Sequence, residues 1–212
     1  MFCICKNILH LYQKQTKHIQ MKQKNIDCIK KAVESVSDDD KLEDYIVKAL
    51  FSLMKTISFE DISITDITKK AGVGRATYYR HFNSKEDVIR YYFTKEMRTF
   101  VSTSQLIPQS KDDMFEIMFK ILSELKEKKE VMEILIQTRQ ERIYIDFLNT
   151  NMQKFVTTHW GADSAYVAYF MSGALFNLSL MWIKKGCVES VKKLTDSFVN
   201  LMFIDENNIR TV

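Results

Sequence analysis

Residues 62–85 constrain the fold of this chain more than any other stretch, because their capping residues define two short helices and a tight turn. Ser63 and Asp66 have the spacing of a capping box, in which each side chain bonds the backbone amide of the other residue. This spacing predicts a first helix over about 64–71. Gly72 can adopt the left-handed conformation that ends a helix, and Gly74 suits the cap of a second helix over about 75–82. The stretch therefore predicts a helix–turn–helix.

Helices are also predicted on both sides of this motif. Ser84 and Asp87 repeat the Ser-x-x-Asp spacing and predict a third helix that runs to about Ser102. Before the motif, apolar residues recur at helical spacing and predict a helix that supports it from below. The residues of this stripe are Leu42, Tyr45, Ile46, Ala49, Leu50, Leu53, Met54 and Ile57.

The second helix of the motif carries side chains that suit DNA. Residues 62–85 hold five basic side chains against one acidic side chain, Asp66. At 100° per residue, Val73, Tyr78 and Phe82 can point inward, which leaves an outer face of Arg75, Thr77, Tyr79 and Arg80. Arg can pair with a guanine edge, Thr can contact a thymine methyl, and Tyr, His and Lys suit phosphate oxygens. An ordinary solvated helix can also be rich in Tyr and Arg, but the two capping boxes and the turn favour a recognition helix.

The run from Ile67 to Val88 resembles the TetR/AcrR family of bacterial transcription regulators. The residues that match the family motif are Ala71, Gly72, Val73, Thr77, Tyr79, Phe82 and Lys85. The resemblance covers about residues 40–100. One departure is Gly74, where the family often has Ser, but Gly is also an accepted cap.

The resemblance implies an all-α protein with a three-helix DNA-binding domain over 40–100. The Lys-rich residues before it, 1–39, are expected to form a basic N-terminal extension. The resemblance also implies a C-terminal helical domain over 101–212 for effector binding and dimerisation. The protein would bind double-stranded DNA at a palindromic operator, as a homodimer formed through the last two helices, about 164–204. Repression is the default sign of regulation, and a small-molecule effector of unknown identity is expected.

The expected DNA contacts fall into three groups. Ser63 and Thr65 should touch phosphate at the N-terminus of the first helix, where the helix dipole also attracts an anion. Arg75, Ala76 and Thr77 should meet base edges. The side chains expected on the DNA backbone are Tyr79, His81 and Lys85.

Composition and charge agree with this interpretation. The chain has one Pro and five Gly in 212 residues, 46% hydrophobic residues and no convincing alternation typical of strands, which favours the all-α class. Residues 1–37 carry a net charge of +5. This segment is either an arm along DNA phosphates or a frayed extension, and Met21 is an alternative start.

The C-terminal half reads as further helices, over about 112–125, 130–138, 141–157, 164–185 and 188–204, with 159–162 a loop. The domain boundary is expected near the single Pro, Pro108. Aromatic and Met side chains are frequent here and suit either a plain core or an apolar effector pocket. Residues 164–183 carry no charge, but their polar residues favour a buried or interface helix over a membrane span.

Other classes of protein receive little support. The four His do not cluster, and the sequence lacks a metalloprotease motif, a phosphate-binding Gly loop and a Ser nucleophile between glycines, so no enzyme activity is expected. The four Cys are scattered, which predicts reduced thiols in a cytoplasmic protein without metal or cofactor. The competing hypothesis is a helical protein–protein interaction module, or a co-activator-type regulator, with lost or altered DNA binding.

Overall fold

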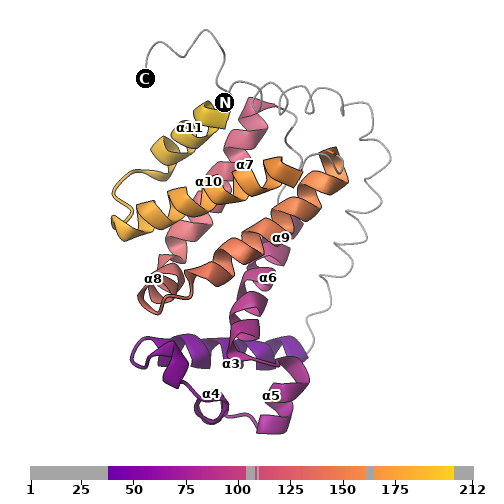
Figure 1. Ribbon diagram of the computed structural model, residues 1–212, viewed down its shortest axis with the longest axis vertical. Helices are drawn as coiled ribbons and strands as arrows, with labels where there is room; N and C mark the ends of the chain where they lie inside the picture. Colours follow the sequence, from indigo (N-terminus) through magenta and orange to yellow (C-terminus); the bar gives the residue numbers. More distant parts are fainter. Residues whose placement is uncertain (1–37, 104–107, 109, 161–164, 203–212) are drawn as a thin grey trace. The chain divides into compact units, whose positions relative to one another are not determined.

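The computed structural model describes residues 38–103, 108, 110–160 and 165–202 (Figure 1). Every regular element in this part of the chain is a helix, which confirms the all-α class. The basic extension and the alternative start at Met21 lie outside the described residues.

The chain divides into two compact units. The first, here called the helix–turn–helix unit, contains the described residues up to Thr103 together with Glu130–Phe147. The second, the C-terminal unit, contains the described residues within 104–129 and 148–212. The predicted division near residue 100 stays a prediction, and the units differ from it in one respect, because residues 130–147 group with the helix–turn–helix.

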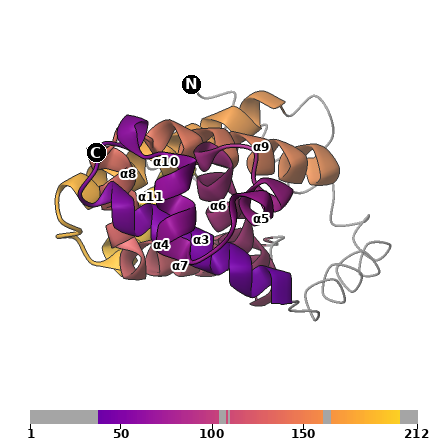
Figure 2. The same cartoon turned by 90° about the horizontal axis from the view of Figure 1, so that it is seen from below.

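The helix–turn–helix unit is built on α3, which covers Asp38–Met54, and continues through a 3-10 turn, η2, at Phe59–Asp61. Helices α4 (Ile64–Ala71), α5 (Arg75–His81) and α6 (Lys85–Thr103) follow. In Figure 1, α4 and α5 lie on one side of α3 and α6 leads away on the other. Figure 2 shows the same unit from below, with α4 and α5 turned toward the viewer.

Buried side chains from all these helices form the core of the unit. The fully buried ones are Ile46, Leu50, Ile67, Tyr78, Val88 and Ile89. The predicted stripe was wrong at two positions, since Tyr45 on α3 is 58% exposed and Ile57, which lies beyond the end of α3, is 38% exposed. Val47 and Phe51 are buried instead, because neighbouring helices cover a different edge of α3 from the one that the spacing suggested.

Residues 130–147 complete this unit. They include most of α8 (Lys129–Gln137) and the start of α9 (Glu141–Trp160). The ring of Phe93 on α6 packs on Tyr144 at 5.0 Å and on Phe147 at 5.5 Å between centroids. Lys55 also pairs with Glu130 at 2.5 Å. Both contacts join segments that are far apart in sequence.

The C-terminal unit contains α7 (Lys111–Glu127), α10 (Ala165–Lys184) and α11 (Val191–Met202), with α7 packed against both of the others. Trp182 is fully buried, and its indole N–H donates to the carbonyl of Glu189 at 3.1 Å. The prediction of a loop over 159–162 was wrong at its start, because α9 continues through Trp160.

Helix α10 is the one helix in the described part that is long and apolar enough to cross a membrane. The core helix of a soluble protein meets the same criterion, and 39% of the apolar window is buried within the molecule. Its buried side includes the polar residues Ser172 and Ser179, whose hydroxyls donate to Asn149 and to the carbonyl of Phe176. The length and apolar composition of α10 are therefore only weak evidence for a membrane span.

Candidate nucleic-acid interface

The capping box predicted at the start of α4 is present. The amide of Ser63 donates to Asp66 Oδ2 at 3.0 Å, and the amide of Asp66 donates to Ser63 Oγ at 3.1 Å. Hydrogen bonds from the Ser63 side chain and backbone lower the pKa of the Asp66 carboxyl, because they stabilise its charged form. The box leaves Ser63 and Thr65 exposed at the positive end of the helix dipole.

The turn between α4 and α5 follows the predicted chemistry. Gly72 has φ of +71°, a conformation that L side chains rarely adopt, and it ends α4. Gly74 has extended backbone angles and caps α5 without a side-chain hydrogen bond. The helix bounds of α4 and α5 match the predicted ranges to within one residue.

Tyr78 anchors α5, the helix predicted to read DNA. It is fully buried, and its hydroxyl donates to the carbonyl of Ser84 at 3.0 Å. Burial raises the pKa of this phenol well above its ordinary value, with a smaller contribution from Asp87. Phe82, also buried, tilts against the Tyr78 ring at a centroid distance of 5.8 Å. With this face fixed to the core, the opposite face of α5 must point outward.

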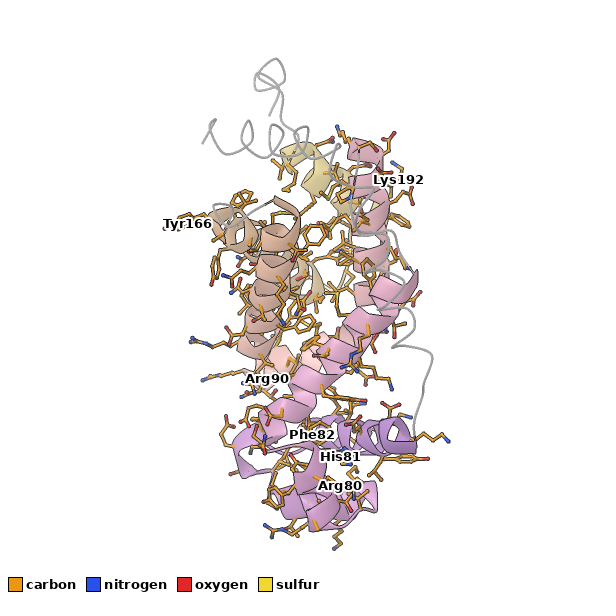
Figure 3. The ribbon with its side chains drawn as sticks, turned by 90° about the vertical axis from the view of Figure 1, so that its right-hand side faces the viewer. Arg80, His81, Phe82, Arg90, Tyr166 and Lys192 are labelled. Atoms are coloured by element: carbon orange, nitrogen blue, oxygen red, sulfur yellow. The ribbon has the colours of Figure 1, made fainter. Side chains whose placement is uncertain are left out.

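The outward face carries the residues predicted to read DNA. Arg75, Ala76, Tyr79 and Arg80 are exposed, and Thr77 is half-buried. Figure 3 places Arg80 lower in the unit than His81 and Phe82, farther from α6. Lys69 and Lys70, in the last turn of α4, are exposed as well, so the surface of the two helices is basic, with Asp66 as its acidic side chain.

Arg75 connects the two helices of the motif. One terminal nitrogen, Nη1, donates to Thr65 Oγ1 at 3.3 Å, and Nη2 donates to the Tyr79 hydroxyl at 3.3 Å. Its guanidinium carbon also lies 5.8 Å from the centroid of the Tyr79 ring. Three of the predicted contact residues are therefore brought into one cluster.

His81 and Lys85, by contrast, have partners inside the unit that the sequence did not reveal. His81 Nδ1 lies 3.2 Å from Glu43 Oε1 on α3, and the His81 side chain is 10% exposed. The Lys85 ammonium donates to three carbonyls, those of Phe59, Glu60 and Ile62. Since an ammonium has three N–H groups, a phosphate contact would require Lys85 to release a carbonyl. The predicted DNA-backbone role of both residues stays a prediction.

Other kinds of site find little support here. Within the described residues, no group of three or more His, Cys, Asp or Glu side chains gathers closely enough to hold a metal ion. Apart from the Asp66 carboxylate, the exposed polar side chains on α4 and α5 are hydroxyls and cations. Such groups bind phosphates and base edges.

Two family models match this chain. The model described as "Bacterial regulatory proteins, tetR family" matches residues 46–92, and that described as "Transcriptional regulator C-terminal region" matches residues 112–203. The first region contains α4 and α5 entire.

Curated relatives include two HTH-type transcriptional regulators of Staphylococcus aureus. The one from strain bovine RF122 / ET3-1 is 34% identical over 59 residues, which is 28% of this chain and 32% of the relative. The one from strain USA300 is 31% identical over 78 residues, which is 37% of this chain and 42% of the relative. The chain thus spans less than half of the length of these relatives.

Two solved structures resemble the fold of this chain over about three quarters of its length. The dihydroxyacetone kinase operon activator DhaS has a TM-score of 0.50 at 19% identity, covering 76% of this chain and 93% of its own. NalD, the secondary repressor of the MexAB-OprM multidrug efflux pump in Pseudomonas aeruginosa, has a TM-score of 0.50 at 16% identity, covering 79% and 96%. At these identities the likeness concerns the fold alone. With both family models matched across the helix–turn–helix and the C-terminal helices, the chain belongs to the TetR family of bacterial regulatory proteins.

Proposed function

We propose that this protein is a cytoplasmic transcription regulator that binds a palindromic operator through α4 and α5. The observation that carries the proposal is the division of α5 into two faces. Tyr78 and Phe82 fix one side of α5 to the core. Arg80 is exposed opposite them, and Arg75 and Tyr79 are exposed at the edge of the buried side. A major groove admits one α-helix, and Arg is the side chain that most often reads guanine there.

Ser63 and Thr65 are proposed to contact phosphate at the start of α4, and Arg75, Ala76 and Thr77 to contact base edges. Tyr79 is proposed to hold the DNA backbone. His81 and Lys85 are proposed to do the same after each gives up a contact inside the unit for a phosphate oxygen. Phosphate contacts supply affinity that falls steeply with salt, whereas base contacts supply the preference for sequence.

Dimerisation is proposed to use α10 and α11. Large apolar side chains remain exposed on α10, at Tyr166 (89%), Tyr169 (52%), Phe170 (49%) and Met181 (47%), and Tyr166 projects outward in Figure 3. Leu201 on α11 is 61% exposed. Tyr166, Phe170, Asn177 and Met181 share one face at helical spacing, opposite the buried residues of the same helix. A two-fold dimer would bury this surface and would place two recognition helices on two half-sites.

A small molecule bound in the C-terminal unit is proposed to change DNA affinity. Effector and DNA would be linked by a coupling free energy of about 1–3 kcal/mol. DhaS is named an activator and NalD a repressor, so the fold is compatible with either sign of regulation.

The test is selection of DNA from a pool of random duplexes, followed by titration of the selected duplex and a scrambled duplex at two salt concentrations. We expect preference for the selected duplex, two protomers per site and weaker binding at higher salt. Arg75→Ala should lose about 1–3 kcal/mol and relax the preference at one base position. Absence of binding to every duplex at low salt would refute the proposal in favour of a protein-interaction module.

The dimer is tested by sedimentation equilibrium. Phe170→Glu should shift the protein toward monomer, because it places a charge in the apolar surface. Tyr45→Glu, which alters an exposed aromatic residue of the helix–turn–helix unit (58% against 49% for Phe170), is the matched control. An unchanged association constant for Phe170→Glu would place the interface elsewhere.

A further inference from the structure

We propose that Thr65 and Tyr79 are positioning residues for Arg75, and that they couple phosphate binding to base reading. This inference rests on the proposed function, since it assigns how the Arg75 side chain is held for that task. The juxtaposition that carries it is the contact of one guanidinium with hydroxyls from both helices of the motif. Thr65 belongs to α4, ten residues before Arg75, and Tyr79 lies one turn further along α5.

The two contacts leave N–H donors of the Arg75 guanidinium available for a base. Each terminal nitrogen of a guanidinium carries two hydrogens. Nη1 uses one for Thr65 and Nη2 uses one for Tyr79, both at 3.3 Å. One N–H therefore remains on each terminal nitrogen, which is what a bidentate contact with guanine O6 and N7 requires. The two hydroxyls thus orient the guanidinium and still leave one donor on each terminal nitrogen.

The hydroxyls of Thr65 and Tyr79 also keep a hydrogen that they can donate. Thr65 and Tyr79 accept from Arg75, so each retains its O–H hydrogen for a phosphate oxygen. Thr65 is exposed in the first turn of α4, where the dipole favours an anion, and Tyr79 is 48% exposed. A hydroxyl that donates to phosphate becomes a better acceptor for Arg75, since linked hydrogen bonds polarise one another. Contact of these hydroxyls with the DNA phosphates would thus hold the Arg75 guanidinium more firmly in its orientation toward the base.

This arrangement also reduces the entropy cost of binding. An unrestrained Arg side chain would lose its rotamer freedom on meeting a base, at about 0.5–1.5 kcal/mol for a flexible side chain. Contact of the Arg75 guanidinium with the Tyr79 ring, 5.8 Å from its centroid, restricts the same side chain before DNA arrives. The cluster therefore favours discrimination between bases over affinity for DNA in general.

The experiment measures discrimination with Thr65→Val, Thr65→Ser, Tyr79→Phe and Arg75→Ala on the duplex that the wild-type protein selects from a random pool. Discrimination is the ratio of Kd for a duplex with one G·C pair replaced by A·T to Kd for the selected duplex. Thr65→Val keeps the shape of the side chain and removes its hydroxyl, and Thr65→Ser restores the hydroxyl. Thr157→Val on α9 and Tyr45→Phe on α3 are matched controls at exposed positions.

We expect Thr65→Val and Tyr79→Phe to lower the discrimination at the base pair read by Arg75 by about threefold or more, and Thr65→Ser to restore it. In the Arg75→Ala background, Thr65→Val should have no further effect on discrimination, since the side chain that it positions is gone. A merely structural role of Thr65 would change affinity for every duplex alike and would add to the effect of Arg75→Ala.

Two outcomes would overturn the inference while leaving the proposed function intact. The first is that Thr65→Val discriminates between the two duplexes as well as the wild type does. The second is that the effects of Thr65→Val and Arg75→Ala on discrimination are strictly additive. Failure of the wild-type protein to select any duplex would instead refute the proposed function. The two failures are therefore distinguishable.

Discussion

Tyr78 and Tyr79 are adjacent in sequence, and the structure predicts that removing the two hydroxyls has opposite consequences. Tyr78→Phe should lower the stability of the fold, whereas Tyr79→Phe should leave stability unchanged and weaken DNA binding. The Tyr78 ring is fully buried and its hydroxyl donates to the carbonyl of Ser84 at 3.0 Å. Phe fills the same space, so the change removes a hydrogen bond without creating a cavity.

The magnitude follows from that one bond. A hydrogen bond within a protein contributes about 0.5–1.5 kcal/mol net, and a carbonyl left without its partner adds desolvation cost. We therefore expect Tyr78→Phe to lower the free energy of unfolding by about 1–2 kcal/mol. For Tyr79→Phe, at a site 48% exposed, the expected change is within about 0.5 kcal/mol.

The assay is urea unfolding followed by circular dichroism at a fixed protomer concentration, because dissociation of the proposed dimer would make stability depend on concentration. Tryptophan fluorescence is a poor choice, since the buried Trp182 reports on the C-terminal unit. DNA titration of both variants completes the comparison. Equal loss of stability in the two variants, or none in Tyr78→Phe, would refute the division of α5 into an anchoring and a reading face.

Three further predictions concern the supports of the reading helices. Gly72→Ala should lower the free energy of unfolding by about 1–2 kcal/mol, because L side chains rarely adopt a φ of +71°. An added Cβ meets no atom within 4 Å, so the whole cost comes from the backbone conformation. Urea unfolding measures this loss, and Gly72→Asn should lose less stability than Gly72→Ala. Lys85→Met should lower stability by about 1.5–3 kcal/mol through loss of the bonds to three carbonyls; weaker DNA binding at unchanged stability would show instead that Lys85 acts on phosphate. The lowered pKa of Asp66 means that its contribution to stability is present above its unfolded pKa, about 4, and is lost as pH falls through the lower folded value. Unfolding measured across acid pH should therefore show a shallower loss of stability for Asp66→Asn than for the wild type, and an identical pH dependence would contradict this.

Local chemistry is what made α4 and α5 predictable from sequence. Ser63 and Asp66 define the start of α4, and Gly72 defines its end, through hydrogen bonds between residues no more than four apart in sequence. The inward position of Tyr78 followed from helical spacing in the same way. Such features depend on the neighbouring residues, so the sequence alone carries them.

Contacts between distant residues could not be predicted in this way. His81 meets Glu43, 38 residues earlier, and Phe93 meets Tyr144. Helical spacing put Tyr45 on the buried stripe of α3, but which edge of a helix is covered depends on where other helices pack, and Tyr45 is exposed. The pairing of Arg75 with Thr65 was missed for the same reason, although both residues were assigned to DNA.

The grouping of residues 130–147 with the helix–turn–helix bears on how this family member could be recombined with others. A chimaera that takes residues up to Thr103 from this chain would inherit Phe93 without Tyr144 and Phe147, and Lys55 without Glu130. The unit proposed to bind DNA is thus discontinuous in sequence, and a transplant of the proposed operator preference would have to carry two separate segments. Natural substitutions at Phe93 are then expected to accompany substitutions at Tyr144 or Phe147, and those at Lys55 to accompany substitutions at Glu130.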